Sequence, residues 1–250
     1  GCFEGAGILQ ITEKLYENDS LLKECWAKVL SCNKKDKGYE IVLDRTVIFP
    51  EGGGQPSDKG WIDGTILMYA SEKDGQVFHY CNEAIAVGSE VLVKLDWARR
   101  LDHMQQHCGE HLLSYAFWKL FGANNIGFHM NEQSVFVDLD KEISLEEVLQ
   151  AEDFVNNEIW ENKPIAVSYI SSEDLNDGEM RKKNENIKGI LRIVSVERGD
   201  SCTCCGTHPP ATGTVGITKV IGFDRHRGGM RIEFVCGRRA LLDARRKHEA

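Results

Sequence analysis

Two groups of histidine and cysteine residues constrain the fold of this chain more than any other feature of its sequence. His103, His107 and His111 follow one another at four-residue intervals, and on a helix that spacing places neighbouring imidazoles on one face, about 40° apart. Cys204 and His208 have the same spacing much later in the chain. Nitrogen and sulfur ligands of this kind are typical of a Zn²⁺ site. If two of these histidines bind one ion together with Cys204 and His208, the fold must bring the two distant segments together.

Cys204 and His208 lie in the segment SCTCCGTHPP, which begins at Ser201. Gly206 and the prolines at 209 and 210 disfavour a regular helix, so we expect a loop there. Two further thiols, Cys202 and Cys205, could compete for the fourth ligand position. The alternative interpretation is a buried thiol cluster, with the histidines serving as core or surface groups.

Short strands separated by turns are the pattern of the first hundred residues, which predicts a small antiparallel β-barrel. Apolar residues then recur at helical spacing over 97–121, and a second helix is predicted over 145–160, begun by a capping box of Ser144 and Glu147. Mixed strands and helices in this second part indicate an α+β fold. The expected strands are 24–31, 38–49, 60–69, 76–80, 90–95, 165–169, 190–196, 215–223 and 229–236.

We expect three segments along the chain. Residues 1–95 form the barrel domain with a glycine-rich loop, 96–240 form the α+β domain with the metal site, and 241–250 begin a C-terminal helix that a longer chain would continue. The loop reads PEGGGQPSD from Pro50. Its successive glycines permit positive φ and close approach of another molecule, although a flexible hairpin loop is the alternative. No lysine follows at P-loop spacing, so ATP binding is not expected.

The composition limits the partners and the compartment. Thirty Lys and Arg against 39 Asp and Glu give a net charge of −9, which on its own argues against a nucleic-acid partner. The charge is uneven, because 224–250 contains eight Lys and Arg but four Asp and Glu. No apolar run approaches a membrane span, and the first residues do not read as a secretion signal. Nine cysteines, an odd number, favour reduced thiols and a cytoplasmic protein.

Five separated segments together are similar to a known family. They read LDRTVIFPEGGGQPSDKGWI, MQQHCGEHLL, VNNEIWENKPI, CCGTH and RIEFVCGRRAL. In this order they resemble the editing domain of alanyl-tRNA synthetase, and most of all its free-standing relatives, the AlaX-type trans-editing proteins. The resemblance implies a glycine-rich small barrel followed by an α+β editing domain with zinc. It also implies hydrolysis of mischarged tRNA(Ala), with Ser-tRNA(Ala) as the first substrate and Gly-tRNA(Ala) as the second.

The resemblance also assigns roles to single residues. The implied zinc ligands are His107, His111, Cys204 and His208, with His103 outside the set. The implied substrate-binding residues are Gly52, Gly53, Gly54 and His129. The expected catalytic residues are Gln55, Glu110 and Cys205, of which the last two depart from the family's pattern. Cys205 stands where the family commonly has glycine, and Glu110 lies between the first two ligands, so both are expected to face the metal.

Two other functions fit parts of the sequence. A non-catalytic, zinc-dependent tRNA-binding module would use the same ligands and the basic C-terminal segment. The residues expected to bind tRNA there are Arg225, Arg227, Arg231, Arg238 and Arg239. A metallopeptidase is the second alternative, because 107–111 formally reads H-x-x-E-H and Glu185 could supply a distant third ligand. That function leaves Cys204 and His208 unexplained. The sequence leaves the oligomeric state open.

Overall fold

The structure is a computed structural model that describes residues 10–175, 180–181 and 189–250. It divides into two compact units, one made of Gly1–Glu51 and Ser57–Arg99 and the other of Gly52–Pro56 and Arg100–Ala250. The α+β class expected from the sequence is confirmed. The glycine-rich loop, expected in the first domain, groups with the second unit. None of the helices in the described ranges combines the length and the apolar character needed to span a membrane.

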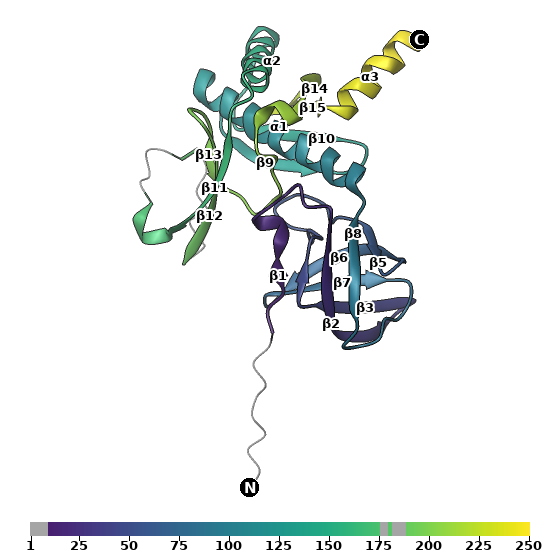
Figure 1. The fold of residues 1–250 in the computed structure, drawn as a ribbon. Helices are drawn as coiled ribbons and strands as arrows, with labels where there is room; N and C mark the ends of the chain where they lie inside the picture. Colours follow the sequence, from purple (N-terminus) through teal and green to yellow (C-terminus); the bar gives the residue numbers. More distant parts are fainter. Residues whose placement is uncertain (1–9, 176–179, 182–188) are drawn as a thin grey trace. The chain divides into compact units, whose positions relative to one another are not determined.

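The first unit is built on a ring of antiparallel strands (Figure 1). Each strand pairs with two neighbours, in the order β2, β3, β7, β6, β5, β8 and back to β2. Inward-facing side chains such as Ile41, Val77 and Val93 form its apolar core. The unit contains β1 (Glu13–Lys14), η1 (Leu15–Glu17), β2 (Glu24–Lys35), β3 (Gly38–Leu43), β4 (Arg45–Thr46), β5 (Gly60–Ile62), β6 (Thr65–Lys73), β7 (Gln76–Cys81) and β8 (Glu90–Leu95).

Two of the expected strands are divided in the structure. The segment 60–69 contains β5 and the first five residues of β6, and Asp63 and Gly64 separate the two strands. Both residues have positive φ, +49° and +81°, which a two-residue hairpin turn requires and an Asp-Gly pair supplies. The segment 38–49 likewise ends its first strand at Leu43, before the two-residue β4. Because β-forming residues lie on both sides of each break, the sequence predicts one continuous strand in each segment.

One histidine of the first unit, His79, is fully buried. Its Nδ1 lies 2.9 Å from the carbonyl oxygen of Ile41, and its Nε2 lies 2.8 Å from Oγ1 of Thr46. Because a carbonyl only accepts, Nδ1 carries the proton and Nε2 accepts from the Thr46 hydroxyl. Burial lowers the pKa of His79 from 6.5 to about 4. The ring is therefore neutral at pH 7, and its hydrogen bonds tie β7 to β3 and β4.

A four-stranded antiparallel sheet, in the order β14-β15-β10-β9, is the frame of the second unit. Two helices, α1 (Trp97–Phe121) and α2 (Leu145–Trp160), pack on one face of it (Figure 1). Apolar residues of both helices share one core with alternate strand residues such as Val137 and Ile232. The strands are β9 (Asn125–Met130), β10 (Val135–Leu139), β14 (Thr218–His226) and β15 (Gly229–Cys236).

The predicted helices are present with the predicted bounds. α2 begins with a capping box, in which Ser144 accepts from the backbone N–H of Glu147 and the Glu147 side chain accepts from the backbone N–H of Ser144. A third helix, α3 (Arg238–Glu249), follows β15. Helical spacing and capping residues were therefore reliable signals in this chain.

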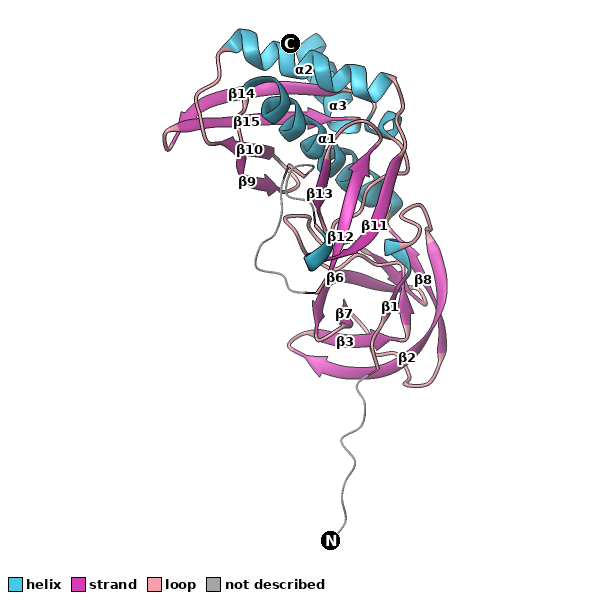
Figure 2. Cartoon of the chain, turned by 90° about the vertical axis from the view of Figure 1, so that its left-hand side faces the viewer, coloured by secondary structure: helices cyan, strands magenta, loops and turns pink. Residues whose placement is uncertain are grey.

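A three-stranded sheet carries the loop that contains Cys204 and His208 (Figure 2). The sheet order is β11-β12-β13, and Cys202 of β13 pairs with Val194 of β12. Nη1 of Arg192 donates to the carbonyl oxygens of Cys204 and Gly206, at 2.8 and 2.9 Å, and so holds the loop to the sheet. The elements are β11 (Ile165–Ser171), η2 (Ser172–Asp174), β12 (Ile190–Val196), β13 (Ser201–Thr203) and η3 (Thr212–Val215).

Side chains of α2 cover part of the edge strand β14. Asn156 donates from Nδ2 to the carbonyl oxygen of Thr218 at 3.0 Å and accepts at Oδ1 from its N–H at 2.8 Å. Glu152 accepts from the backbone N–H of Val220 at 2.8 Å and pairs with Lys219. These two side chains occupy backbone groups to which a further strand would otherwise bind.

Candidate metal centre

A cluster of one cysteine and three histidines forms where α1 meets the loop after β13. The helix presents His107 and His111 on successive turns, and the loop supplies Cys204 and His208. One ligand atom from each residue lies within 4.8 Å of the other three. The three histidines are buried and Cys204 is half-buried. The fold thus brings the two distant pairs together, in a cluster that could hold a metal ion.

The sulfur of Cys204 is close to two of the imidazoles. Its Sγ lies 3.5 Å from Nε2 of His107 and 3.3 Å from Nε2 of His208. The backbone N–H of Gly206 also donates to this sulfur, at 3.3 Å. A Cβ at position 206 would lie 2.2 Å from Cε1 of His107, so the loop can approach the helix only with glycine there. Three nitrogens and one sulfur form a donor set that suits Zn²⁺ and disfavours Mg²⁺ or Ca²⁺.

The electrostatic surroundings favour the metal-binding forms of Cys204 and His208, whereas Cys202, Cys204, Glu110 and Asp200 outweigh burial and raise the pKa of His111 well above 6.5. Burial raises the pKa of the Cys204 thiol, but the imidazoles of His107, His111 and His208 outweigh it and lower that pKa well below 9.0. Burial, together with the neighbouring His111, lowers the pKa of His208 to about 3. A thiolate and a neutral imidazole are the states in which these side chains coordinate metal ions.

The glycine-rich loop reaches the cluster through Gln55, which is completely buried. Its Oε1 lies 2.8 Å from Nδ1 of His107 and accepts from the backbone N–H of Thr207 at 3.0 Å. Its Nε2 donates to the hydroxyl of Thr207 at 2.7 Å. These bonds account for the grouping of 52–56 with the second unit. Gln55 thus touches an expected ligand directly, where the sequence suggested a residue covering the pocket.

The other side of His111 faces a buried carboxylate and a thiol. Nδ1 of His111 lies 3.5 Å from Oδ2 of Asp200 and 3.2 Å from Sγ of Cys202. Asp200 is 1% exposed and accepts two hydrogen bonds from Arg181, at 2.8 Å from Nε and 3.0 Å from Nη2. His111, Asp200 and Cys202 form a second group whose ligand atoms lie within 4.8 Å of one another.

Glu110 directs one carboxylate oxygen towards the cluster. Its Oε1 accepts from the hydroxyl of Ser114 at 2.9 Å and from Nδ2 of Asn125 at 2.8 Å. Its Oε2 lies 3.5 Å from Nε2 of His111. One oxygen is therefore fixed by two donors, and the other is beside an expected ligand.

The glycine-rich loop also approaches Cys205 and Phe128. A Cβ on Gly53 would lie 2.6 Å from Sγ of Cys205, and one on Gly54 would lie 2.8 Å from the ring of Phe128. Phe128 in turn stacks on His107, with ring centroids 5.3 Å apart. Cys205 itself is exposed. The loop and Cys205 therefore lie at the accessible side of the cluster.

His129, expected to bind substrate, does not point to the cluster. Successive side chains of a strand point to opposite faces, and Phe128 is the β9 residue on the His107 side. His129 stacks on Phe136 of β10, with centroids 4.9 Å apart, on the opposite face of the sheet. His129 therefore faces away from the cluster, and its substrate-binding role stays a prediction. His103 is buried and belongs to neither ligand group in the described residues.

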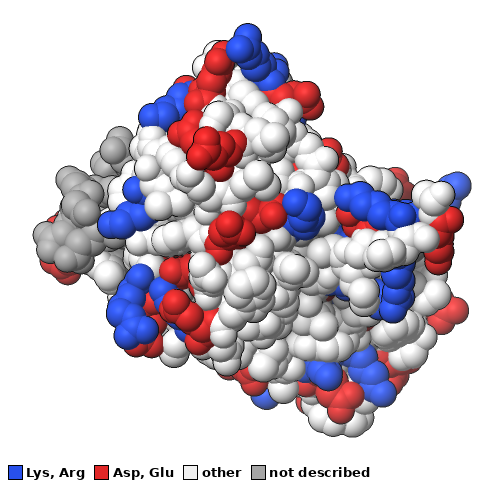
Figure 3. Space-filling view, turned by 90° about the horizontal axis from the view of Figure 1, so that it is seen from above, with Lys and Arg blue, Asp and Glu red and all other residues white. Residues whose placement is uncertain are grey.

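The arginines expected to bind tRNA divide into two sets. Arg231 and Arg239 form two-point ion pairs, Arg231 with Asp138 at 2.8 and 3.0 Å and Arg239 with Asp102 at 3.0 and 2.9 Å. Their charges are therefore largely compensated. The exposed members are Arg225, Arg227 and Arg238. On the face drawn in Figure 3, basic and acidic side chains are intermixed.

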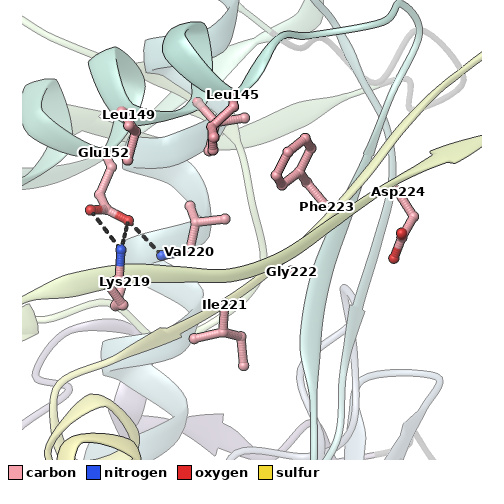
Figure 4. Close-up of a pocket in the computed structure, with 10 residues that line it drawn as sticks. Leu145, Leu149, Glu152, Lys219, Val220, Ile221, Gly222, Phe223 and Asp224 are labelled. Carbon is pink, nitrogen blue, oxygen red and sulfur yellow. Dashed lines mark hydrogen bonds and ion pairs between the residues drawn. The ribbon is translucent and has the colours of Figure 1, made fainter.

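A groove of about 340 Å³ lies between α2 and β14 of the second unit (Figure 4). Leu145 and Leu149 line it from the helix and Phe223 from the strand, with the Glu152–Lys219 ion pair beside them. No expected ligand, catalytic residue or tRNA-binding residue is among its lining residues. The groove is therefore separate from the candidate metal centre of this unit.

Sequence reasoning missed three residues that contact the cluster or its supports. Asp200 and Arg181 have no spacing to the histidines that indicates a shared site, so only the fold reveals them. Thr207 lies inside the CCGTH segment, and that segment was a usable signal for it. Glu185, the third ligand of the metallopeptidase alternative, lies outside the described residues.

Comparison with known proteins identifies relatives over most of the chain. It is 31% identical over 251 residues to alanyl-tRNA editing protein Aarsd1 of Rattus norvegicus, covering 94% of this chain and 61% of that protein. It is 34% identical over 240 residues to alanyl-tRNA editing protein AlaX-L of Pyrococcus horikoshii, covering 92% and 59%. No family model matches the chain. The chain is thus a relative of these proteins and spans about three-fifths of their length.

Proposed function

We infer that this chain is an alanyl-tRNA editing protein of the free-standing AlaX type, and we propose that it hydrolyses the ester of mischarged tRNA(Ala) in trans. The observation that carries the proposal is the His/Cys cluster, with Glu110 and the glycine-rich loop against it in one unit. The similarity of the chain to proteins named alanyl-tRNA editing proteins supports the substrate class. Such a reaction would serve translation fidelity.

The proposed substrates are Ser-tRNA(Ala) first and Gly-tRNA(Ala) second. A site built to accept alanine cannot strongly reject the smaller glycine, or serine with its added hydroxyl, so a separate hydrolytic site is needed. A polar group in that second site can require the serine hydroxyl, because bound alanine would leave the group without a hydrogen bond. The net result is cleavage of one ester by one water, which gives a free amino acid and the tRNA hydroxyl.

We propose that zinc is held by His107, His111, Cys204 and His208. The donor set and the lowered pKa of Cys204 support this assignment. When bound there, zinc supplies positive charge that can polarise a substrate oxygen or lower the pKa of a water. In this proposal Glu110 would take the proton of the attacking water and return it to the leaving oxygen, and the hydrogen bonds of Ser114 and Asn125 to Oε1 rather than Oε2 support that role.

The remaining expected residues are assigned to substrate contact. The backbone of Gly52, Gly53 and Gly54 would border the aminoacyl group, since glycine allows close approach, and Cys205 would lie beside it. Arg225, Arg227 and Arg238 would contact tRNA phosphates from the exposed surface. We place the reaction in the cytoplasm, because an odd number of cysteines favours reduced thiols.

The test is hydrolysis of Ser-, Gly- and Ala-tRNA(Ala), measured with and without a zinc chelator and with Glu110→Gln as the matched variant. We expect rapid loss of the seryl ester, slower loss of the glycyl ester, little loss of the alanyl ester, and a large decrease in Glu110→Gln. Tight binding of all three tRNAs without hydrolysis would instead establish the non-catalytic tRNA-binding module.

A further inference from the structure

We propose that Gln55 and Asp200 act as a matched pair of positioning residues, each fixing one imidazole so that its Nε2 faces the metal. The inference rests on the proposed zinc site and extends it to residues that do not coordinate the ion. A histidine ligand binds through one ring nitrogen while the other carries a proton, and the partner of that proton decides which nitrogen is free.

The contact of Gln55 determines the tautomer of His107. The amide orientation of Gln55 is fixed, because its nitrogen donates to the Thr207 hydroxyl and its oxygen accepts from the Thr207 N–H. The atom 2.8 Å from Nδ1 of His107 is therefore the amide oxygen, which cannot donate. Nδ1 must carry the proton. The lone pair is left on Nε2, the nitrogen that lies 3.5 Å from Sγ of Cys204.

Asp200 has the same relation to His111. Its carboxylate is buried and held at both oxygens by Arg181, and Oδ2 lies 3.5 Å from Nδ1 of His111. A carboxylate only accepts, so Nδ1 of His111 donates to this side. Nε2 of His111, which lies 3.5 Å from Oε2 of Glu110 in the metal-free chain, is then the nitrogen that a bound metal would take. The third histidine, His208, also directs Nε2 at Cys204, at 3.3 Å.

The two positioning residues come from segments that are far apart in the sequence. Gln55 belongs to the glycine-rich loop, and Asp200 follows β12. Each sets one of two ligands that are adjacent on α1. The neutral amide of Gln55 fixes orientation alone, whereas the anionic carboxylate of Asp200 also makes its imidazole a stronger ligand. The site would therefore become incomplete if either segment moved.

The experiment measures zinc affinity by competition with a chelator for the full chain and its variants. Loss of an outer hydrogen-bond partner weakens metal binding by about 10- to 100-fold, and we expect this for Asp200→Asn and for Gln55→Ala. Gln55→Glu keeps an acceptor at Nδ1 of His107 and should restore most of the affinity. The matched control is Asp138→Asn, because Arg231 holds Asp138 at the same 2.8 and 3.0 Å and Asp138 belongs to neither ligand group.

A second measurement follows the ring nitrogens of His107 and His111 by ¹⁵N NMR in the zinc-free chain. We expect His107 to carry its proton on Nδ1 with Nε2 unprotonated, and Asp200→Asn to disturb the Nδ1 signal of His111 while leaving the signal of His107. Unchanged zinc affinity in both Asp200→Asn and Gln55→Ala, or a proton on Nε2 of His107 in the wild type, would overturn the inference. Absence of zinc binding by the wild type would overturn the proposed metal site instead, and the NMR result would still decide the tautomers.

Discussion

Gly53 and Cys205 approach each other so closely that a Cβ on Gly53 would lie 2.6 Å from the cysteine sulfur. Gly53 also has a φ of +58°, in the left-handed region. The conformation of the glycine-rich loop therefore depends on the absence of a side chain at position 53 and on the size of the side chain at position 205.

Gly53→Ala should reduce deacylation about tenfold, because a non-glycine residue with left-handed backbone costs about 1–2 kcal/mol and 1.36 kcal/mol corresponds to a factor of ten. The added methyl group also meets Cys205. Single-turnover hydrolysis of Ser-tRNA(Ala) measures the effect. Gly64→Ala is the control, since Gly64 has a φ of +81° but no atom within 4 Å of its Cβ position. Cys205→Gly in the same chain should recover part of the activity, and no recovery would show that backbone strain alone is responsible.

Removal of the ligands should abolish zinc binding. We expect His107→Ala/Cys204→Ala to retain almost no zinc, and we expect its unfolding temperature to match that of the chelated wild type, because metal binding energy contributes to folding. Elemental analysis and thermal unfolding check both points. Cys32→Ala, a half-buried thiol of the first unit, should keep the full zinc content. Stoichiometric zinc in the double variant would contradict the ligand assignment.

Acid should destabilise the first unit through His79. Its pKa in the folded chain is about 4, below the ordinary 6.5, so the unfolded chain binds the proton more readily between these values. The full contribution is present above pH 6.5 and decreases as the pH falls towards 4, by up to ~3 kcal/mol.

Urea unfolding at several pH values, with chelator present, measures this dependence. His79→Gln does not titrate and should show a flatter decrease over the same window. Parallel pH curves for the wild type and His79→Gln would contradict the assignment of a buried neutral imidazole.

Reversal of two exposed charges should weaken tRNA binding without changing the chemistry. Arg225→Glu/Arg227→Glu should raise KM for mischarged tRNA and reduce the slope of log affinity against log salt by roughly one per lost phosphate contact. The hydrolysis of a short seryl ester without tRNA should be unchanged. Equal losses on both substrates would place these arginines in the catalytic centre or in the fold.

Local signals allowed much of this fold to be predicted. The bounds of α1 and α2 follow from helical spacing and the Ser144–Glu147 capping box, which depend on neighbouring residues only. The Asp63–Gly64 pair is a hairpin signal, but the β-forming residues on both sides of it predict one continuous strand over 60–69.

The features that could not be predicted depend on contacts between distant segments. Phe128 and His129 are adjacent in sequence, and only the register of β9 decides which of them faces His107. Asp200 approaches His111 because β12 and β13 place the turn between them beside α1. No pattern in the sequence marks either relationship, although the ligand pairs themselves were recognisable by their spacing.

The hydrogen bonds from Asn156 and Glu152 to β14 have a consequence for how copies of this chain meet. An uncovered edge strand can recruit the edge of another molecule and start a continuous intermolecular sheet. Here the N–H groups of Thr218 and Val220 are already occupied by side chains of the same chain. Growth of such an assembly at this end of the sheet would first require α2 to release both contacts, so the helix acts as a barrier to aggregation as well as a layer of the core.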